Sequence, residues 1–393
     1  MAPHTPERSA RPGEPGARLD VAAAGPDMAP HTPQRSPRPG EPGARLDVAA
    51  VSCPVPLTGS DRILLGHGSG GKMTAELIAR CFLPAFQNDA LLKRDDQAVI
   101  DLAGVRMAFT TDSYVVTPLF FPGGDIGDLA VNGTVNDLAM AGAQPLYLSA
   151  AFILEEGFLL ADLERIVASM RKAAEAAGVL FVTGDTKVVE RGKADGCFIT
   201  TTGLGLIAHD RTISADRARP GDVVILSGPI AEHGMAIMAA RADLGLETPV
   251  ASDSAALHRM VLDMLGTGAD IHCLRDPTRG GVATALNELA QQSGVGVVLD
   301  EAAITVREPV RGVCELLGLD PLYVANEGKL LAVVPRADTK RVLAAMQRHP
   351  EGREARVVGE VIADTARLVV LKTTVGGRRI VDMLQGEQLP RIC

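Results

Sequence analysis

The last residue of the chain, Cys393, is the strongest candidate for chemistry in the sequence. It ends the segment Pro390-Arg391-Ile392-Cys393, and a cysteine at the tip of a chain has no evident role in packing. An exposed thiol is reactive and open to oxidation, so its presence there indicates use. No resolving cysteine lies nearby in the sequence, which disfavours a generic redox role. The sequence predicts a functional thiol at Cys393.

Two glycine-rich stretches could bind phosphate. The first is His67-Gly68-Ser69-Gly70-Gly71-Lys72. Small residues let backbone N–H groups approach phosphate oxygens, and the lysine adds a positive charge. Its spacing is not that of a Walker A motif, and an ordinary flexible turn is the alternative. The second is Asp276-Pro277-Thr278-Arg279-Gly280-Gly281, just before an expected helix whose N-terminus could bind an anion. A plain loop entering that helix is the alternative.

Acidic residues recur where apolar runs meet turns. They stand in the segments Asp95-Asp96, Thr111-Asp112-Ser113, Asn136-Asp137, Gly184-Asp185-Thr186-Lys187 and Arg275-Asp276-Pro277. Folds of the α/β class place ligand-binding groups at strand ends, and Mg²⁺ binds through a few carboxylates, phosphate oxygens and water. Each aspartate alone is explained as a turn or helix-cap residue. As a set, they fit a metal-bound nucleotide if the fold brings them together.

The elements that must position these residues alternate between short apolar runs and amphipathic stretches. A helix ending at Gly178 is predicted from apolar residues at helical spacing: Leu163, Ile166, Val167, Met170 and Ala174. A second helix is expected at 282–292, and strands are expected at 179–183 (buried), 197–207, 223–226, 295–299, 330–334 and 368–371. This alternation predicts an α/β (α+β) protein of two domains.

We divide the chain into four parts. Residues 1–58 contain a tandem repeat, in which 2–23 recur as 29–50, and their Pro, Gly and Arg content predicts disorder. Residues 59–219 and 220–380 form the two expected domains, separated at the turn Arg219-Pro220-Gly221-Asp222. The regular pattern ends after Gly377, so residues 381–393 are expected to form a mobile tail. Thirteen extended residues span at most ~43 Å, enough to expose Cys393 or to withdraw it.

Composition excludes several function classes. The net charge of -9 argues against a sequence-independent nucleic-acid binder, and an aromatic content of 3% leaves few residues for base stacking. The six cysteines include no CxxC pair, which disfavours a zinc ribbon or a disulfide framework. No apolar run is long enough to cross a membrane, and the start does not read as a secretory signal. A cytoplasmic enzyme that binds neither nucleic acid nor membrane is expected.

The chemistry-bearing residues together resemble the HypE family of hydrogenase maturation proteins, the carbamoyl dehydratases. The resemblance runs from about Ile63 to Cys393, and its most specific signal is the Pro-Arg-Ile-Cys ending. The other matching segments are 67–72, 111–131, 132–143, 184–189, 274–283 and 326–329. Without the ending, these segments would also fit the wider superfamily of aminoimidazole ribonucleotide synthetase, selenophosphate synthetase and thiamine monophosphate kinase. The duplicated N-terminal segment departs from the family.

The resemblance implies a fold, an activity and partners. The expected fold is the two-domain aminoimidazole ribonucleotide synthetase type, with an N-terminal sheet domain that binds ATP and forms a homodimer. The expected activity is ATP-dependent dehydration of a carbamoyl group on Cys393 to a thiocyanate, which supplies the cyanide ligand of the [NiFe]-hydrogenase iron. A HypF-type carbamoyltransferase would load Cys393, and a HypC–HypD iron scaffold would accept the product.

The resemblance also assigns roles to residues. Cys393 would carry the substrate, Glu327 would be the base, and Lys187 would assist electrostatically, with a structural ion pair as the alternative for the last two. Mg²⁺ would be held by some of Asp96, Asp112, Asp137 and Asp276. ATP would be bound by the following set: Gly68, Ser69, Gly70, Gly71, Lys72, Asp95, Asp112, Asn136, Asp185, Thr186, Arg279 and Gly280.

Two other functions remain open on the sequence. One is an ATP-dependent synthase or kinase of the same superfamily that acts on a free small molecule. The other is a non-catalytic carrier, in which Cys393 shuttles a group between partners and ATP gates the tail.

Overall fold

The computed structural model describes residues 62–242, 250–386, 389 and 391–393. The predicted disorder of residues 1–58 lies outside the described residues. None of the helices in the described ranges is long and apolar enough to span a lipid bilayer.

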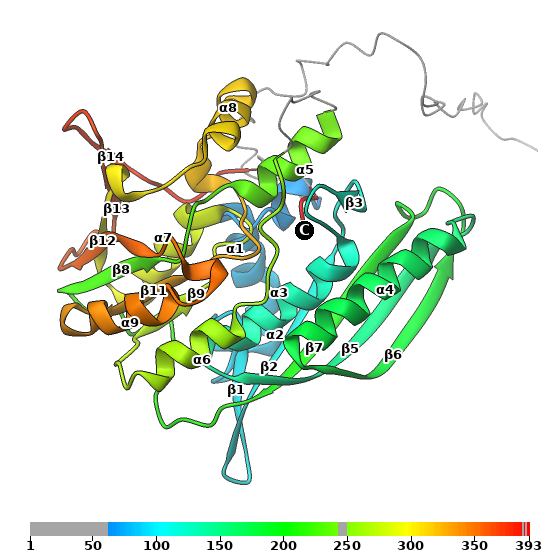
Figure 1. Ribbon diagram of the computed structural model, residues 1–393, viewed down its shortest axis with the longest axis horizontal. Helices are drawn as coiled ribbons and strands as arrows, with labels where there is room; N and C mark the ends of the chain where they lie inside the picture. The colour runs from blue at the N-terminus through cyan, green and yellow to red at the C-terminus, as the bar shows by residue number, and fades with distance from the viewer. Residues whose placement is uncertain (1–61, 243–249, 387–388, 390) are drawn as a thin grey trace, which may run out of the picture. The chain divides into compact units, whose positions relative to one another are not determined.

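The first domain is built on a five-stranded sheet. Its order is β1 (Ala98–Leu102), β2 (Val105–Tyr114), β7 (Cys197–Leu206), β5 (Gln144–Glu155) and β6 (Leu180–Val189). Strands β5 and β6 are parallel and are connected by α4 (Leu160–Ala177), and the other neighbouring pairs are antiparallel. Helices α3 (Ile126–Met140) and α4 cover one face of this sheet (Figure 1). Apolar side chains on the other face, including Phe109, Tyr147 and Ile153, are exposed.

The second domain is built on a seven-stranded sheet. Its order is β14 (Arg378–Ile380), β13 (Val369–Lys372), β10 (Gly296–Asp300), β12 (Arg356–Ile362), β8 (Asp222–Leu226), β11 (Leu331–Pro335) and β9 (Cys273–Arg275). Its helices are α5 (Glu232–Ala242), α6 (His258–Gly266), α7 (Gly281–Ser293), α8 (Glu308–Leu317) and α9 (Thr339–Met346). Every residue of β8 is buried, as expected of an apolar central strand.

Short elements precede the first sheet and lead into the longer helices and strands. The glycine-rich loop precedes α1 (Lys72–Leu77), a single π turn (Ile78–Phe82) and α2 (Leu83–Phe86). The hairpin of β3 (Phe120–Phe121) and β4 (Gly124–Asp125) leads into α3. Asp125 caps α3, because its side chain accepts the N–H groups of Gly127 and Asp128. Single 3-10 turns lie at Leu65–Gly68, Leu91–Lys93, Glu301–Ala303, Pro321–Tyr323, Arg336–Asp338 and Pro350–Gly352.

The α/β class predicted from the sequence is confirmed. Helix α4 ends at Gly178, which has the left-handed φ of 73° that suits glycine at a helix end. Two local expectations were wrong. The strand predicted as buried at 179–183 is β6, an exposed strand at the edge of the sheet that continues to Val189. Residues 378–380 form β14, because pairing with β13 supplies hydrogen bonds that the local sequence pattern does not indicate.

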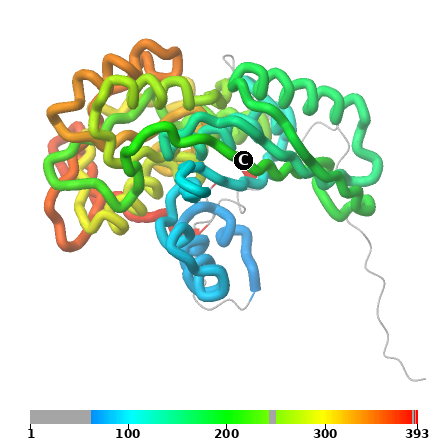
Figure 2. Tube along the Cα trace, turned by 90° about the horizontal axis from the view of Figure 1, so that it is seen from below, coloured from blue at the N-terminus to red at the C-terminus, as the bar shows by residue number. Residues whose placement is uncertain are grey.

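Residues near the end of the chain are docked against both domains. Val381, Leu389 and Ile392 are buried in the main core. The N–H groups of Val115 and Thr117 donate to the carbonyls of Cys393 (3.0 Å) and Arg391 (3.2 Å). Figure 1 shows this end of the chain, marked C, beside β3, and Figure 2 shows the same end from below. Cys393 is therefore held next to the segment that directly follows β2.

Candidate active site

Charged side chains from both domains surround Cys393. Burial raises the pKa of its thiol to about 12, and the negative charges of Glu327 and Asp112 act in the same direction. The Arg279 guanidinium opposes them and lowers that pKa. Arg279 also lies 3.8 Å from Asp112, measured from Nη2 to Oδ1. The fold thus brings Cys393, Glu327, Asp112 and Arg279 within electrostatic reach of one another.

Glu327 is fixed by its backbone while its carboxyl group is left available. Its N–H donates to Asp253 (3.1 Å), and its carbonyl accepts from the side chain of Asn136 (3.1 Å). The side chain is buried, and Oε1 has no hydrogen-bond partner. Burial raises the pKa of Glu327 well above its usual value, and the nearby Asp276 and Asp112 raise it further. A buried carboxyl without a partner is expected where a ligand or substrate completes the site.

The four predicted metal ligands lie in one acidic region. Burial raises the pKa values of Asp96 and Asp137 well above normal and that of Asp276 to about 6. The charge of Asp276 raises the pKa of Asp96 further, and the charges of Asp276, Asp112 and Asp96 raise that of Asp137. Arg275 binds Asp96 Oδ1 at 2.8 Å, but Asp96 Oδ2 is buried without a partner. Within the described ranges, no three His, Cys, Asp or Glu side chains are arranged to hold a metal by themselves. The excess negative charge fits a divalent cation that also takes phosphate and water ligands.

The first glycine-rich loop lies between Arg279 and the chain end. The Lys72 N–H donates to Leu384 O at 2.8 Å, and Ser69 Oγ donates to Gly386 O at 3.0 Å. A Cβ on Gly70 would lie 2.7 Å from the Cβ of Arg279, so only glycine fits this approach. The Lys72 side chain is exposed. The predicted loop residues from Gly68 to Lys72 therefore adjoin the cluster around Cys393, and Gly280 adjoins it as the N-cap of α7.

Other predicted residues are used in structural contacts. Asp95 accepts the N–H of Ala215 at 2.8 Å, and burial raises its pKa. The Asn136 amide is fully engaged, because it donates to Ala255 O as well as to Glu327 O and accepts the N–H of Leu257. Asn136 thus joins α3 to the loop that carries Glu327.

The segment from Asp185 to Lys187 is not brought to the cluster within one chain. Lys187 Nζ forms an exposed ion pair with Asp185 at 2.7 Å. The strand register places Asp112, Thr201, Ala150 and Gly184 in one row on the helix-covered face. Asp185 and Lys187 stand one and three residues beyond Gly184 and therefore face the opposite side of the sheet. Thr186 lies between them on the same edge strand.

Tyr114 belongs to the cluster although the sequence reasoning did not select it. It is 1% exposed, and its hydroxyl oxygen has no hydrogen-bond partner. Burial raises its pKa, and Asp112 and Glu327 are among the charges that act on it. Gly133 makes room for the ring, because a Cβ there would lie 2.2 Å from the hydroxyl oxygen. The period of two along β2 places Tyr114 and Asp112 on the same face and could have identified it.

The chain is similar to known proteins at two levels, a broad class defined by its two domains and a single family within that class. Residues 94–207 match the N-terminal domain of the AIR synthase related proteins, and residues 219–371 match their C-terminal domain. The chain is 60% identical to the carbamoyl dehydratase HypE of Cupriavidus necator over 335 residues, which cover 85% of this chain and 95% of that protein. The chain belongs to the carbamoyl dehydratase HypE family and is an enzyme of hydrogenase maturation.

Two solved structures of relatives agree with this assignment. A HypE–HypF complex matches with a TM-score of 0.75 and 48% identity, covering 78% of this chain and 99% of the solved one. A hydrogenase maturation protein HypE in complex with ATP matches with a TM-score of 0.72 and 51% identity, covering 84% and 100%.

Proposed function

We propose that this carbamoyl dehydratase acts on a carbamoyl group attached to its own Cys393. The observation that supports it is the docked thiol among Arg279, Glu327 and Asp112, together with the unpartnered carboxyl oxygen of Glu327. The substrate is S–C(=O)–NH2 and the product is S–C≡N. Both remain on the sulfur, so the site needs no separate pocket for a free substrate.

The reaction balances as loss of one water driven by ATP. The carboxamide oxygen attacks the γ-phosphorus of ATP, the bond to the β-phosphate oxygen breaks, and ADP leaves. The nitrogen then gives up its two protons, its electrons form the C≡N bond, and the C–O bond breaks to release phosphate. Glu327 is the proposed base for this nitrogen, because its carboxyl is buried beside the thiol and lacks a partner. Arg279 is positioned to stabilise negative charge that develops on the oxygen.

ATP and Mg²⁺ would bind next to this carboxyl group. The relative that was solved with ATP supports nucleotide binding. The loop from Gly68 to Lys72, together with Arg279 and Gly280, would contact the phosphates, with the side chains of Lys72 and Arg279 as cationic donors. Mg²⁺ would be held by Asp96, Asp112, Asp137 and Asp276 and would neutralise charge on the transferred phosphoryl group. Because Asp95 and Asn136 are engaged in structural hydrogen bonds, we propose that they support this site without contacting the nucleotide.

Loading of Cys393 requires a different position of the chain end. A thiol must lose its proton to attack a carbamoyl donor, and the docked environment raises the pKa of Cys393 to about 12. We therefore propose that a HypF-type carbamoyltransferase loads the tail outside this site and that the tail then withdraws. The solved HypE–HypF complex of a relative supports this partner. A HypC–HypD iron scaffold as acceptor, and a cytoplasmic location, remain predictions.

Lys187 would act only across a homodimer. The uncovered face of the first sheet carries exposed apolar residues from several strands: Ile100, Leu102, Phe109, Tyr147 and Ile153. A second copy of the chain packed on this face would bury them and would bring Asp185 and Lys187 to the interface. This predicts that a mixture of Lys187→Ala and Cys393→Ala chains, each inactive alone, regains dehydration through mixed dimers. An active Lys187→Ala chain would remove Lys187 from the mechanism, and no regain in the mixture would make it act in its own chain.

The proposed function is tested by intact mass of the chain after incubation with ATP, Mg²⁺, carbamoyl phosphate and a HypF-type partner. A carbamoyl adduct should form on the parent, be absent from Cys393→Ala, and lose the mass of one water only with ATP. An adduct that never loses water would support a carrier instead. ATP consumption on a free metabolite without any adduct would support a superfamily synthase or kinase.

A further inference from the structure

A fully buried histidine holds the end of the chain. His233 stands in the first turn of α5, and its Nε2 lies 2.6 Å from the carbonyl oxygen of Ile392. A carbonyl oxygen only accepts, so Nε2 must carry the proton. In the neutral ring, Nδ1 then accepts, and the hydroxyl of Ser252 at 2.8 Å can donate to it. The edge of the ring packs against Phe121, with centroids 5.6 Å apart.

Ser252 begins a short segment, 252–254, that also fixes the loop of Glu327. The Ser254 N–H donates to Ser252 Oγ at 3.1 Å. Between them, the Asp253 carboxylate accepts the Glu327 N–H at 3.1 Å and Lys329 Nζ at 2.8 Å. A continuous path of hydrogen bonds and covalent bonds therefore links the Ile392 carbonyl to the backbone of Glu327.

Helix α5 is attached to the same loop and to the tail at a second point. The Ala231 N–H donates to Asn326 Oδ1 (2.7 Å), and the Gly234 N–H donates to Ala325 O (3.1 Å). At the other end of the helix, Arg241 Nη2 donates to the Arg391 carbonyl at 2.9 Å. Side chains of α5 thus donate hydrogen bonds to two successive carbonyls near the chain end, those of Arg391 and Ile392. The start of the helix is hydrogen-bonded to Ala325 and Asn326, the residues that precede Glu327.

We propose that His233 is a positioning residue that latches the terminal segment in its docked place and, through segment 252–254, aligns the Glu327 loop with it. Docking of Cys393 and placement of the base are then one event. The role of Glu327 rests on the proposed function. The latch on Cys393 rests on the contacts alone and can be tested without any carbamoyl chemistry.

The test measures how fast iodoacetamide alkylates Cys393 in the folded full-length chain. A Cys53→Ser, Cys81→Ser background removes two other thiols, and the three that remain besides Cys393 are buried: Cys197, Cys273 and Cys314. His233→Ala should raise the alkylation rate roughly tenfold, the factor expected for loss of one buried hydrogen bond. His233→Gln keeps an amide donor for the Ile392 carbonyl and should stay near the parent rate. The matched control is His258→Ala, which removes a buried histidine at the start of α6.

A second readout separates positioning from simple stability. On a tail already carbamoylated, His233→Ala should slow water loss at saturating ATP and leave the KM for ATP unchanged. A folded His233→Ala chain that alkylates at the parent rate would overturn the latch. If that variant does not fold, Ser252→Ala replaces it, with several-fold faster alkylation expected and an unchanged rate counting against the proposal. Failure of the parent to lose water would contradict the proposed function and leave the alkylation result standing.

Discussion

At the scale of single residues, the site is defined by groups left without partners. Glu327 Oε1, Asp96 Oδ2 and the Tyr114 hydroxyl are buried polar atoms without hydrogen bonds. Leaving such an atom unpaired costs about 1–3 kcal/mol, so a fold retains it where a substrate or ion supplies the partner. Glu327 and Tyr114 belong to the electrostatic cluster around Asp112, and Asp96 is coupled to it through Asp276.

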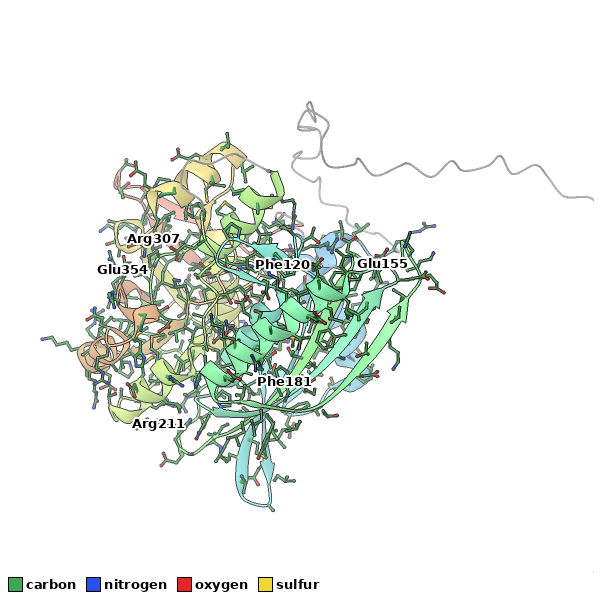
Figure 3. All side chains as sticks on the ribbon, turned by 45° about the vertical axis from the view of Figure 1, so that its right-hand side comes forward. Phe120, Glu155, Phe181, Arg211, Arg307 and Glu354 are labelled. Carbon is green, nitrogen blue, oxygen red and sulfur yellow. The ribbon has the colours of Figure 1, made fainter. Side chains whose placement is uncertain are left out.

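Glu327→Gln is predicted to slow water loss from the carbamoylated tail by about 10²–10⁴-fold, the usual contribution of a general base. The base must be deprotonated and its pKa is raised, so the parent rate should increase with pH until it passes that raised pKa. The variant should lose this dependence. Single-turnover mass measurements from pH 5 to 9 check both effects. Glu354→Gln, at a partly exposed ion pair with Arg307 (Figure 3), is the control, and equal slowing there would count against a specific role.

Tyr114→Phe is predicted to separate stability from activity. Removal of an unpartnered buried hydroxyl should leave the free energy of unfolding unchanged or increase it by about 1 kcal/mol. If the hydroxyl serves the bound carbamoyl group, water loss should slow by at least tenfold. Urea unfolding and the single-turnover assay are made on the same samples. A stable, fully active Tyr114→Phe would remove the hydroxyl from the reaction.

At the scale of elements, close backbone approaches set the site's geometry. Gly281 begins α7 directly after Arg279 and Gly280, with a φ of 62°. A Cβ at this position would lie 2.5 Å from the carbonyl oxygen of Leu322. The start of α7 therefore packs against the segment that leads into the Glu327 loop. Arg279 lies two residues before this helix and reaches the cluster from there.

Gly281→Ala is predicted to destabilise the chain by about 1–3 kcal/mol, because the left-handed φ and the contact with Leu322 both oppose a Cβ. Gly312→Ala is the matched variant, since Gly312 lies in exposed α8 with nothing within 4 Å of the added Cβ. It should stabilise by about 0.5–1 kcal/mol through better helix propensity. Denaturant midpoints decide the comparison, and equal shifts in the two variants would contradict the packing argument.

At the scale of the whole molecule, the first sheet has one covered and one uncovered face. Helices α3 and α4 cover the first, and exposed apolar side chains occupy the second. On the covered side, at the edge of the sheet, Phe181 of β6 (labelled in Figure 3) and apolar residues of α4 line an apolar groove. The exposed apolar side chains of the uncovered face are characteristic of an interaction surface, and the proposed homodimer would cover that face.

Charge introduced on the uncovered face is predicted to produce monomers. The double variant Phe109→Lys, Ile153→Lys adds two ammonium groups per chain, and the cost of burying them would oppose association. Size-exclusion chromatography with light scattering should then report the mass of one chain. Water loss should fall together with the dimer if Lys187 acts across it. Val375→Lys, at a position 92% exposed in the second domain, should leave the mass unchanged. A parent chain that is already monomeric would contradict the homodimer.

The sequence by itself determined the elements and the candidate chemistry. The spacing of apolar residues and the positions of glycine and proline predicted the helix that ends at Gly178 and the apolar strand β8, and residue type alone marked Cys393 as a candidate. Tertiary structure alone decided which candidates meet. The alternation of side chains along the strands places Asp112 and Tyr114 on the helix-covered face of the sheet and Lys187 on the opposite face. A hydrogen bond between residues far apart in the sequence holds Ile392 against His233. Such pairings depend on register and on contacts between distant segments, which local sequence patterns do not encode.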